Sequence, residues 1–164
     1  MKKILMGLVM VLFAMTANAQ FEAGKKYIGA SVSGLNLSYS KQSKTTFDFS
    51  ATAGMFLAEA WMVTAQLGYN HVQDTNAFEI GAGGRYYITQ NGLYLGLGVL
   101  YGHSDNGEGS NFKTDNFFLT PEIGYAFFIN EYLTIEPAVY YRMSLNEFSD
   151  GSTVGLKIGL GYYF

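Results

Sequence analysis

Apolar and polar residues alternate along most of the chain after residue 25. In one stretch the apolar positions are Trp61, Val63, Ala65, Leu67 and Tyr69, and the positions between them include Thr64, Gln66, Gly68 and Asn70. A period of two is typical of a β-strand with one apolar face. The pattern predicts eight strands, over residues 26–39, 45–57, 61–72, 77–88, 93–103, 116–128, 132–144 and 153–164.

Two features of this pattern predict local irregularities within the strands. The apolar phase of the first expected strand flips at Gly34, between Val32 and Leu35, as it does at a β-bulge. Pro121 and Pro137 lie inside later strands, where proline removes a hydrogen bond of the ladder. We therefore expect bulges at both prolines as well.

The connections between the expected strands alternate in length. Those after the second, fourth and sixth strands are the short segments "AEA", "TQNG" and "INEY". Those after the other strands are mostly longer and polar, led by residues 104–116 and 145–153. Short turns at one rim and long loops at the other are the plan of an up-and-down transmembrane barrel.

Composition helps to decide whether such a barrel lies in water or in a membrane. Charged residues make up 14% of the chain, against about 25% in ordinary soluble domains. The polar face is mostly Gly, Ser and Thr, whereas the exterior of a soluble barrel, such as a lipocalin, would carry many Lys and Glu. Glycine also suits the narrow interior of an eight-stranded barrel. The fold class predicted is therefore all-β, an eight-stranded antiparallel transmembrane barrel, with a soluble barrel as the alternative.

Aromatic residues on the apolar face concentrate near the strand ends, as in the two interfacial girdles of a membrane barrel. Toward the long-loop rim these are Phe47, Tyr69, Phe78, Tyr101, Phe117 and Tyr141. Toward the short-turn rim they are Trp61, Tyr86, Phe127 and Phe164. The expected partner of this face is lipid.

The first 19 residues have the three regions of a secretory signal peptide. Lys2 and Lys3 are followed by an apolar stretch, and Ala17-Asn18-Ala19 forms a cleavage site before Gln20. We expect residues 1–19 to be removed and residues 20–164 to form one barrel domain. The chain has no cysteine, so we expect no disulfide and no lipid anchor. Its net charge of −3 and lack of a basic patch make nucleic acid an unlikely partner.

The C-terminal strand ends on "GYYF", which resembles the aromatic signature by which outer-membrane barrel precursors are recognised. Together with "TAGMFLAEAWMVTAQLGY" (52–69), "GAGGRYYI" (81–88) and "PEIGYAFFINEYLTIEPAVYY" (121–141), it resembles the small outer-membrane β-barrel domain family. That family is similar to the eight-stranded barrels of the OmpA/OmpX type. The resemblance implies a Gram-negative outer membrane, both termini in the periplasm, and recognition of Phe164 by the barrel-assembly machinery.

Seven charged residues fall on the inward phase of the expected strands. They are Asp48, Glu79, Arg85, Glu122, Glu136, Arg142 and Lys157. Removing an isolated charge from water into a narrow lumen costs several kcal/mol, so buried charges are expected to pair. The near balance of sign predicts an ion-pair plug, since a selective pore would show an excess of one charge. An ion or proton path is the alternative.

Catalytic and metal-binding patterns are weak in this sequence. The only histidines are His71 and His103, and His103-Ser104 lacks the spacing of the His-x-Ser element in the lipid A deacylases that resemble this architecture. Acidic residues of the longest loop, such as Asp105, Glu108 and Asp115, lack calcium-loop spacing. We expect no enzyme activity, cofactor or metal. The expected role is structural or surface interaction with a ligand that the sequence does not identify; the alternatives are a carrier of small hydrophobic molecules and a lipid A-modifying enzyme.

Overall fold

A computed structural model describes residues 21–36, 47–72, 75–88, 92–106, 114–145 and 152–164, and the structural statements below concern these residues. They form the strands β1 (Lys26–Asn36), β2 (Phe47–Ala58), β3 (Trp61–Val72), β4 (Thr75–Tyr87), β5 (Leu93–Asn106), β6 (Thr114–Tyr125), β7 (Phe127–Phe128), β8 (Leu133–Ser144) and β9 (Thr153–Tyr163). Within the described ranges, no helix is long and apolar enough to cross a membrane.

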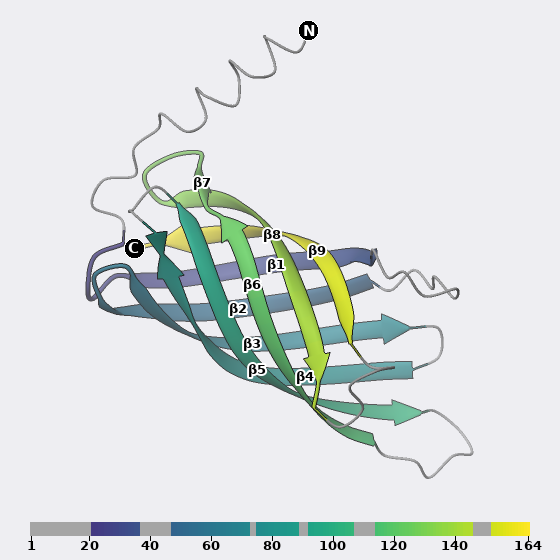
Figure 1. The fold of residues 1–164 in the computed structure, drawn as a ribbon. Helices are drawn as coiled ribbons and strands as arrows, with labels where there is room; N and C mark the ends of the chain where they lie inside the picture. The colour runs from purple at the N-terminus through teal and green to yellow at the C-terminus, as the bar shows by residue number, and fades with distance from the viewer. Residues whose placement is uncertain (1–20, 37–46, 73–74, 89–91, 107–113, 146–151) are drawn as a thin grey trace, which may run out of the picture.

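The strands close into an antiparallel barrel, whose strands cross the molecule at a tilt (Figure 1). Neighbours in sequence pair from β1 to β6, β8 pairs with β6 and β9, and β9 pairs with β1. The two-residue β7 continues β6 along β8, so the barrel has eight strands, as the sequence predicts. At the junction of the chain ends, Lys26 N–H donates to the Phe164 carbonyl at 2.7 Å and Phe164 N–H donates to the Lys26 carbonyl at 3.0 Å.

The predicted bulge in the first strand is confirmed. The register between β1 and β9 shifts between Ser33 and Leu35, on either side of Gly34. The extra residue moves Leu35 to the phase opposite to Val32, which accounts for the flip in the apolar pattern. A second shift, which the sequence pattern did not predict, separates Phe56 from Ala58 where β2 meets β3.

The bulges predicted at the two prolines are wrong. Pairing between β6 and β8 lapses at Thr120 and Pro121 and then resumes in the same register, while Pro121 stays paired with Leu97 of β5. Pro137 keeps its pairing with Ile158 and lies opposite the break between β6 and β7, again with no change of register. A missing N–H is accommodated here by omitting ladder contacts on one side, without an extra residue.

Burial is inverted relative to a soluble domain. Large apolar side chains such as Leu97, Ile158 and Leu160 are more than half exposed, whereas Arg85 and Glu136 are buried. The exposed apolar positions follow one phase of each strand around the barrel, and the buried polar ones follow the other. An apolar exterior of this extent is what a lipid environment requires.

Candidate functional site in the lumen

The strands bring the predicted inward-facing charges into one lumen. Asp48 comes from β2, Glu79 and Arg85 from β4, Glu122 from β6, Glu136 and Arg142 from β8, and Lys157 from β9. The lumen has two parts, which we call the short-turn half and the long-loop half after the connections at the nearer rim. Arg85 and Glu136 lie in the former, and Asp48, Glu79 and Arg142 in the latter.

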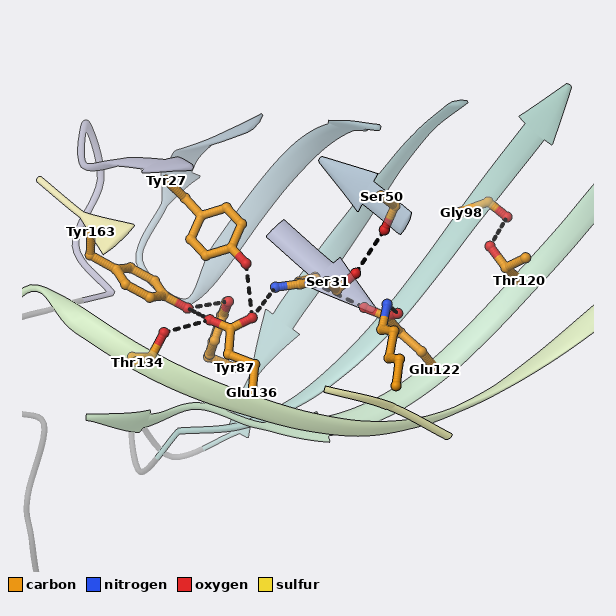
Figure 2. A network of polar contacts seen from close by, with 12 residues as sticks. Tyr27, Ser31, Ser50, Tyr87, Gly98, Thr120, Glu122, Thr134, Glu136 and Tyr163 are labelled. Carbon is orange, nitrogen blue, oxygen red and sulfur yellow. Dashed lines mark hydrogen bonds and ion pairs between the residues drawn. The ribbon is translucent and has the colours of Figure 1, made fainter. Parts of the chain in front are cut away.

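Glu136 is the centre of the polar network in the short-turn half (Figure 2). Its Oε2 accepts hydrogen bonds from the Tyr27 hydroxyl and from Arg85 Nη1, each at 2.9 Å. Its Oε1 accepts from the Tyr163 hydroxyl at 2.8 Å and from Thr134 Oγ1 at 2.9 Å. Glu136 is only 2% exposed, and these four donors replace the water that its carboxylate loses on burial.

Arg85 connects the two parts of the lumen. Its Nε donates to Glu122 Oε1 at 3.0 Å, while its Nη1 contacts Glu136 across the barrel. The guanidinium also lies over the rings of Tyr94 and Tyr27, at 4.5 and 5.3 Å from their centroids. Two carboxylates and two aromatic faces thus hold one buried cation in place.

The long-loop half contains two further ion pairs. Lys157 pairs with Glu122, and Arg142 pairs with Glu79. The Arg142 guanidinium also lies 4.0 Å from the ring centroid of Phe118. Asp48 is not brought into an ion pair among the described residues, and its Oδ2 accepts only a long hydrogen bond from Ser33, at 3.4 Å.

A layer of packed aromatic rings lies between the ion pairs and the short-turn rim. Phe21, which precedes β1, stacks on Tyr87 with ring centroids 4.1 Å apart, and the rings of Phe56, Phe128 and Tyr163 surround it. Phe21 is 1% exposed. We call this layer, with Tyr27, Met62, Tyr94 and Ala126, the aromatic floor.

The backbone near Ala60 fixes the position of Phe21. Ala60 has a φ of 63° in the tight turn between β2 and β3. In this conformation its N–H donates to the Phe21 carbonyl at 2.8 Å, and its own carbonyl accepts from Tyr87 N–H at 2.9 Å. The segment before β1 is thereby joined to the base of the barrel.

Glycine at position 161 provides the room that Glu136 needs. A Cβ there would lie 2.5 Å from Glu136 Oε1 and 2.6 Å from Thr134 Oγ1, too close for either atom. In contrast, a Cβ at Gly102, in the long-loop half, would meet the Phe118 ring at 3.4 Å. Such close packing is not confined to the short-turn half, since a Cβ at Gly155 would lie 2.5 Å from the Tyr140 hydroxyl.

A cavity of about 60 Å³ lies in the long-loop half. The charged residues on its wall, together with Tyr140, are Asp48, Glu79, Glu122, Arg142 and Lys157. A smaller cavity of about 30 Å³ extends the space toward Arg85. Since one water needs about 10–15 Å³ by this kind of measure, the larger cavity holds a few water-sized groups.

The predicted girdle residues lie on the outer face wherever their side chains are described. Trp61, Tyr69, Phe78, Tyr86, Phe117 and Phe164 are exposed, and Tyr101, Phe127 and Tyr141 are half-buried. Trp61 and Tyr86 are cross-strand partners with ring centroids 4.7 Å apart, as are Tyr101 and Phe117 at 5.2 Å. The side chain of Phe47 lies outside the described residues.

The weak catalytic and metal patterns form no site that the structure describes. The side chains of His71, Ser104, Asp105 and Asp115 lie outside the described part, as does the whole of Glu108. His103 is half-buried on β5. Among the described residues, no three His, Cys, Asp or Glu side chains gather as metal ligands would.

Sequence reasoning missed the aromatic floor and the tyrosines around Glu136. Tyr163 shares its strand phase with Gly155, Lys157, Gly159 and Gly161, so its inward position was readable from the sequence. Phe21 carried no such signal, because it precedes the first alternating segment.

The sequence matches no protein-family model, and comparison with curated proteins finds no similar sequence. Solved structures, however, match the fold over most of the chain. The N-terminal β-barrel domain of Pseudomonas aeruginosa OprF aligns with a TM-score of 0.65 at 12% identity, over 87% of this chain and 98% of that one. Neisserial surface protein A aligns with a TM-score of 0.63 at 19% identity, over 86% of this chain and 99% of that one. Ail, an outer membrane protein of Yersinia pestis, aligns with a TM-score of 0.58 at 16% identity, over 86% and 99%.

The chain has the fold of the small eight-stranded outer-membrane β-barrels. Closure by β1 and β9, a polar lumen and an apolar exterior are the features that this fold requires in lipid, where no sheet edge can stay unpaired. At these identities the likeness concerns the fold alone, so the role must be argued from the lumen.

Proposed function

We propose that this protein is an integral outer-membrane barrel with a closed lumen, without enzyme activity, that acts as a structural or surface-interaction protein. The observation that carries the proposal is the contact of Arg85 with Glu122 on β6 and Glu136 on β8. These ion pairs cross the lumen directly above the aromatic floor. A continuous water path would require both layers to separate.

The apolar exterior supports insertion in a membrane, and the predicted signal peptide supports export to it. In this arrangement the short-turn rim faces the periplasm with both chain ends, and the polar connections of the other rim face outward. A surface role is in keeping with one structural neighbour, Ail, whose name is attachment invasion locus protein. The proposed partners are outer-membrane lipid, the barrel-assembly machinery and a surface ligand.

Conductance in planar bilayers tests the closed lumen. The purified barrel should give no large stable pore, because charged pairs and packed rings fill the cross-section. A double variant, Arg85→Ala with Phe21→Ala, should raise the frequency of small conductance events if it still shows the heat-dependent gel shift of a folded barrel. Reproducible porin-like conductance of the wild type would contradict the proposal.

Protease treatment of intact cells tests the orientation. Cleavage within residues 104–116 is expected without permeabilisation, and cleavage within residues 89–92 only after it. Cleavage at 89–92 in intact cells would reverse the proposed orientation.

Deletion of Phe164 tests its proposed role in assembly. The side chain is 48% exposed on the outer face. Its loss removes at most about 1.5–3 kcal/mol of stabilising free energy from apolar burial. The deletion should lower outer-membrane levels strongly in the host, with precursor accumulating or degraded, yet the variant should refold in detergent. Normal membrane levels would leave Phe164 as a girdle residue only.

A carrier of small hydrophobic molecules is the second candidate function. The observation that favours it is the interrupted pairing of β6 and β8 at Thr120 and Pro121, beside a cavity that Thr120 and Arg142 line. The charged lining of that cavity favours the first proposal. Uptake of a hydrophobic probe by cells that contain the protein, matched to cells that lack it, separates the two.

A further inference from the structure

The charges of the lumen do not balance, and the imbalance falls on one residue. Arg85 forms ion pairs with both Glu122 and Glu136. Lys157 also pairs with Glu122, and Arg142 pairs with Glu79. The three cations that the described residues place in the lumen are therefore all engaged with the three glutamates. Asp48 is the fourth carboxylate, and it makes no ion pair within the described residues.

Asp48 is also incompletely hydrogen-bonded. Its Oδ1 is buried and accepts no hydrogen bond, while Oδ2 receives only the 3.4 Å contact from Ser33. A carboxylate oxygen that is buried without a donor is costly, since it loses water and gains no protein contact. The residue lies on the wall of the 60 Å³ cavity, and the other charged side chains on that wall are Glu79, Glu122, Arg142 and Lys157, so three carboxylates and two cations share it with Tyr140.

The missing group must bring a positive charge and hydrogen-bond donors in a small volume. A monatomic metal ion fits poorly, because within the described residues no three acidic or imidazole ligands converge. A primary ammonium group carries one charge and three N–H donors, and its size is close to that of water. The cavity accepts such a group with at most a few further heavy atoms.

We propose that the long-loop half of the lumen binds the primary ammonium group of a small amine, with Asp48 as its anionic partner. The ammonium donates to the Asp48 carboxylate, and Glu79 and Tyr140, which line the same cavity, are the candidate acceptors for its other N–H groups. This site goes beyond the proposed function and does not depend on it, since binding in a cavity requires neither conductance nor its absence.

Calorimetric titration of the purified, folded barrel in detergent tests the proposal, with methylammonium chloride as the probe. Saturable binding at a single site is expected. Tetramethylammonium, which has no N–H, and potassium, at matched ionic strength, should bind much more weakly. Equal responses to all three salts would reduce the effect to charge screening, and tighter binding of potassium would indicate a metal-ion site; either result overturns the proposal.

Asp48→Asn is the decisive variant and Glu22→Gln is its matched control. Asp48→Asn keeps the shape and removes the charge, so methylammonium affinity should fall by about tenfold or more, the loss of one charge-assisted hydrogen bond. Glu22 is exposed outside the lumen, and its substitution should leave affinity unchanged. Unchanged affinity in Asp48→Asn, or no wild-type binding, refutes the site. If Asp48→Asn fails to fold, the wild-type series from methyl- through dimethyl- to tetramethylammonium decides, since affinity must fall as N–H donors are lost.

Discussion

The two halves of the lumen contain similar side chains but use them differently. In the short-turn half, Glu136 has four donors and Arg85 is enclosed by two carboxylates and two rings. In the long-loop half, Asp48 has one long hydrogen bond and faces a cavity. The difference teaches that an inward-facing charge is not by itself a structural or a functional residue. The number and kind of partners that the charged group contacts decide which role the geometry favours.

The largest expected effect comes from removing the centre of the short-turn network. Glu136→Ala leaves Arg85 with one carboxylate and removes the carboxylate acceptor of three hydroxyls, so we expect a loss of about 3–5 kcal/mol in the free energy of unfolding. Urea unfolding in lipid vesicles measures it. Glu136→Gln, which retains one carbonyl acceptor, should lose less. Glu79→Ala, in the long-loop half, should cost clearly less than Glu136→Ala; equal losses would erase the distinction between the halves.

The aromatic floor offers the next comparison. Phe21→Ala removes a fully buried ring and leaves a void among Tyr87, Phe56 and Tyr163, with an expected loss of about 3 kcal/mol, the low end for buried Phe. Phe118→Ala removes a half-buried ring that contacts Arg142 and should cost less. The same unfolding assay compares them. A smaller loss for Phe21→Ala than for Phe118→Ala would show that the floor adds little stability.

A single methyl group gives the smallest and sharpest comparison. Gly161→Ala forces a Cβ to within 2.5 Å of Glu136 Oε1, so about 1–3 kcal/mol of overpacking is expected. Gly102→Ala meets Phe118 at 3.4 Å, an ordinary contact that should be tolerated. Thermal unfolding in detergent distinguishes the two variants. If both are tolerated equally, the space at Gly161 is not needed to seat Glu136.

Strand phase accounts for what the sequence predicted well. Alternation placed the residues of β3 and the bulge at Gly34, because each inward or outward position is set by a period of two. The same phase put Arg85, Glu122 and Glu136 in the lumen. Strand phase does not predict which charges pair. Whether Arg85 contacts Glu122, Glu136 or both depends on the stagger of the strands around the barrel and on side-chain length.

The misses have equally physical causes. The prolines were expected to add a residue to the strand, but a strand with two neighbours can omit pairing toward one and keep the other, as Pro121 does with β5. Phe21 was missed since its burial depends on the left-handed turn at Ala60, which is far from it in sequence. Neither outcome leaves a trace in hydrophobic periodicity.

The paired hydrogen bonds between Lys26 and Phe164 make the barrel a ring in which no strand is intrinsically first or last. A circular permutant could link these two ends and open the chain between β5 and β6. All the strand pairings of the barrel would be kept, and only the order in which the strands emerge during synthesis would change. In such a circular permutant "GYYF" remains a strand but is no longer a chain end. The closing of the sheet by this segment would then be separated from its proposed role as an assembly signal at the chain end.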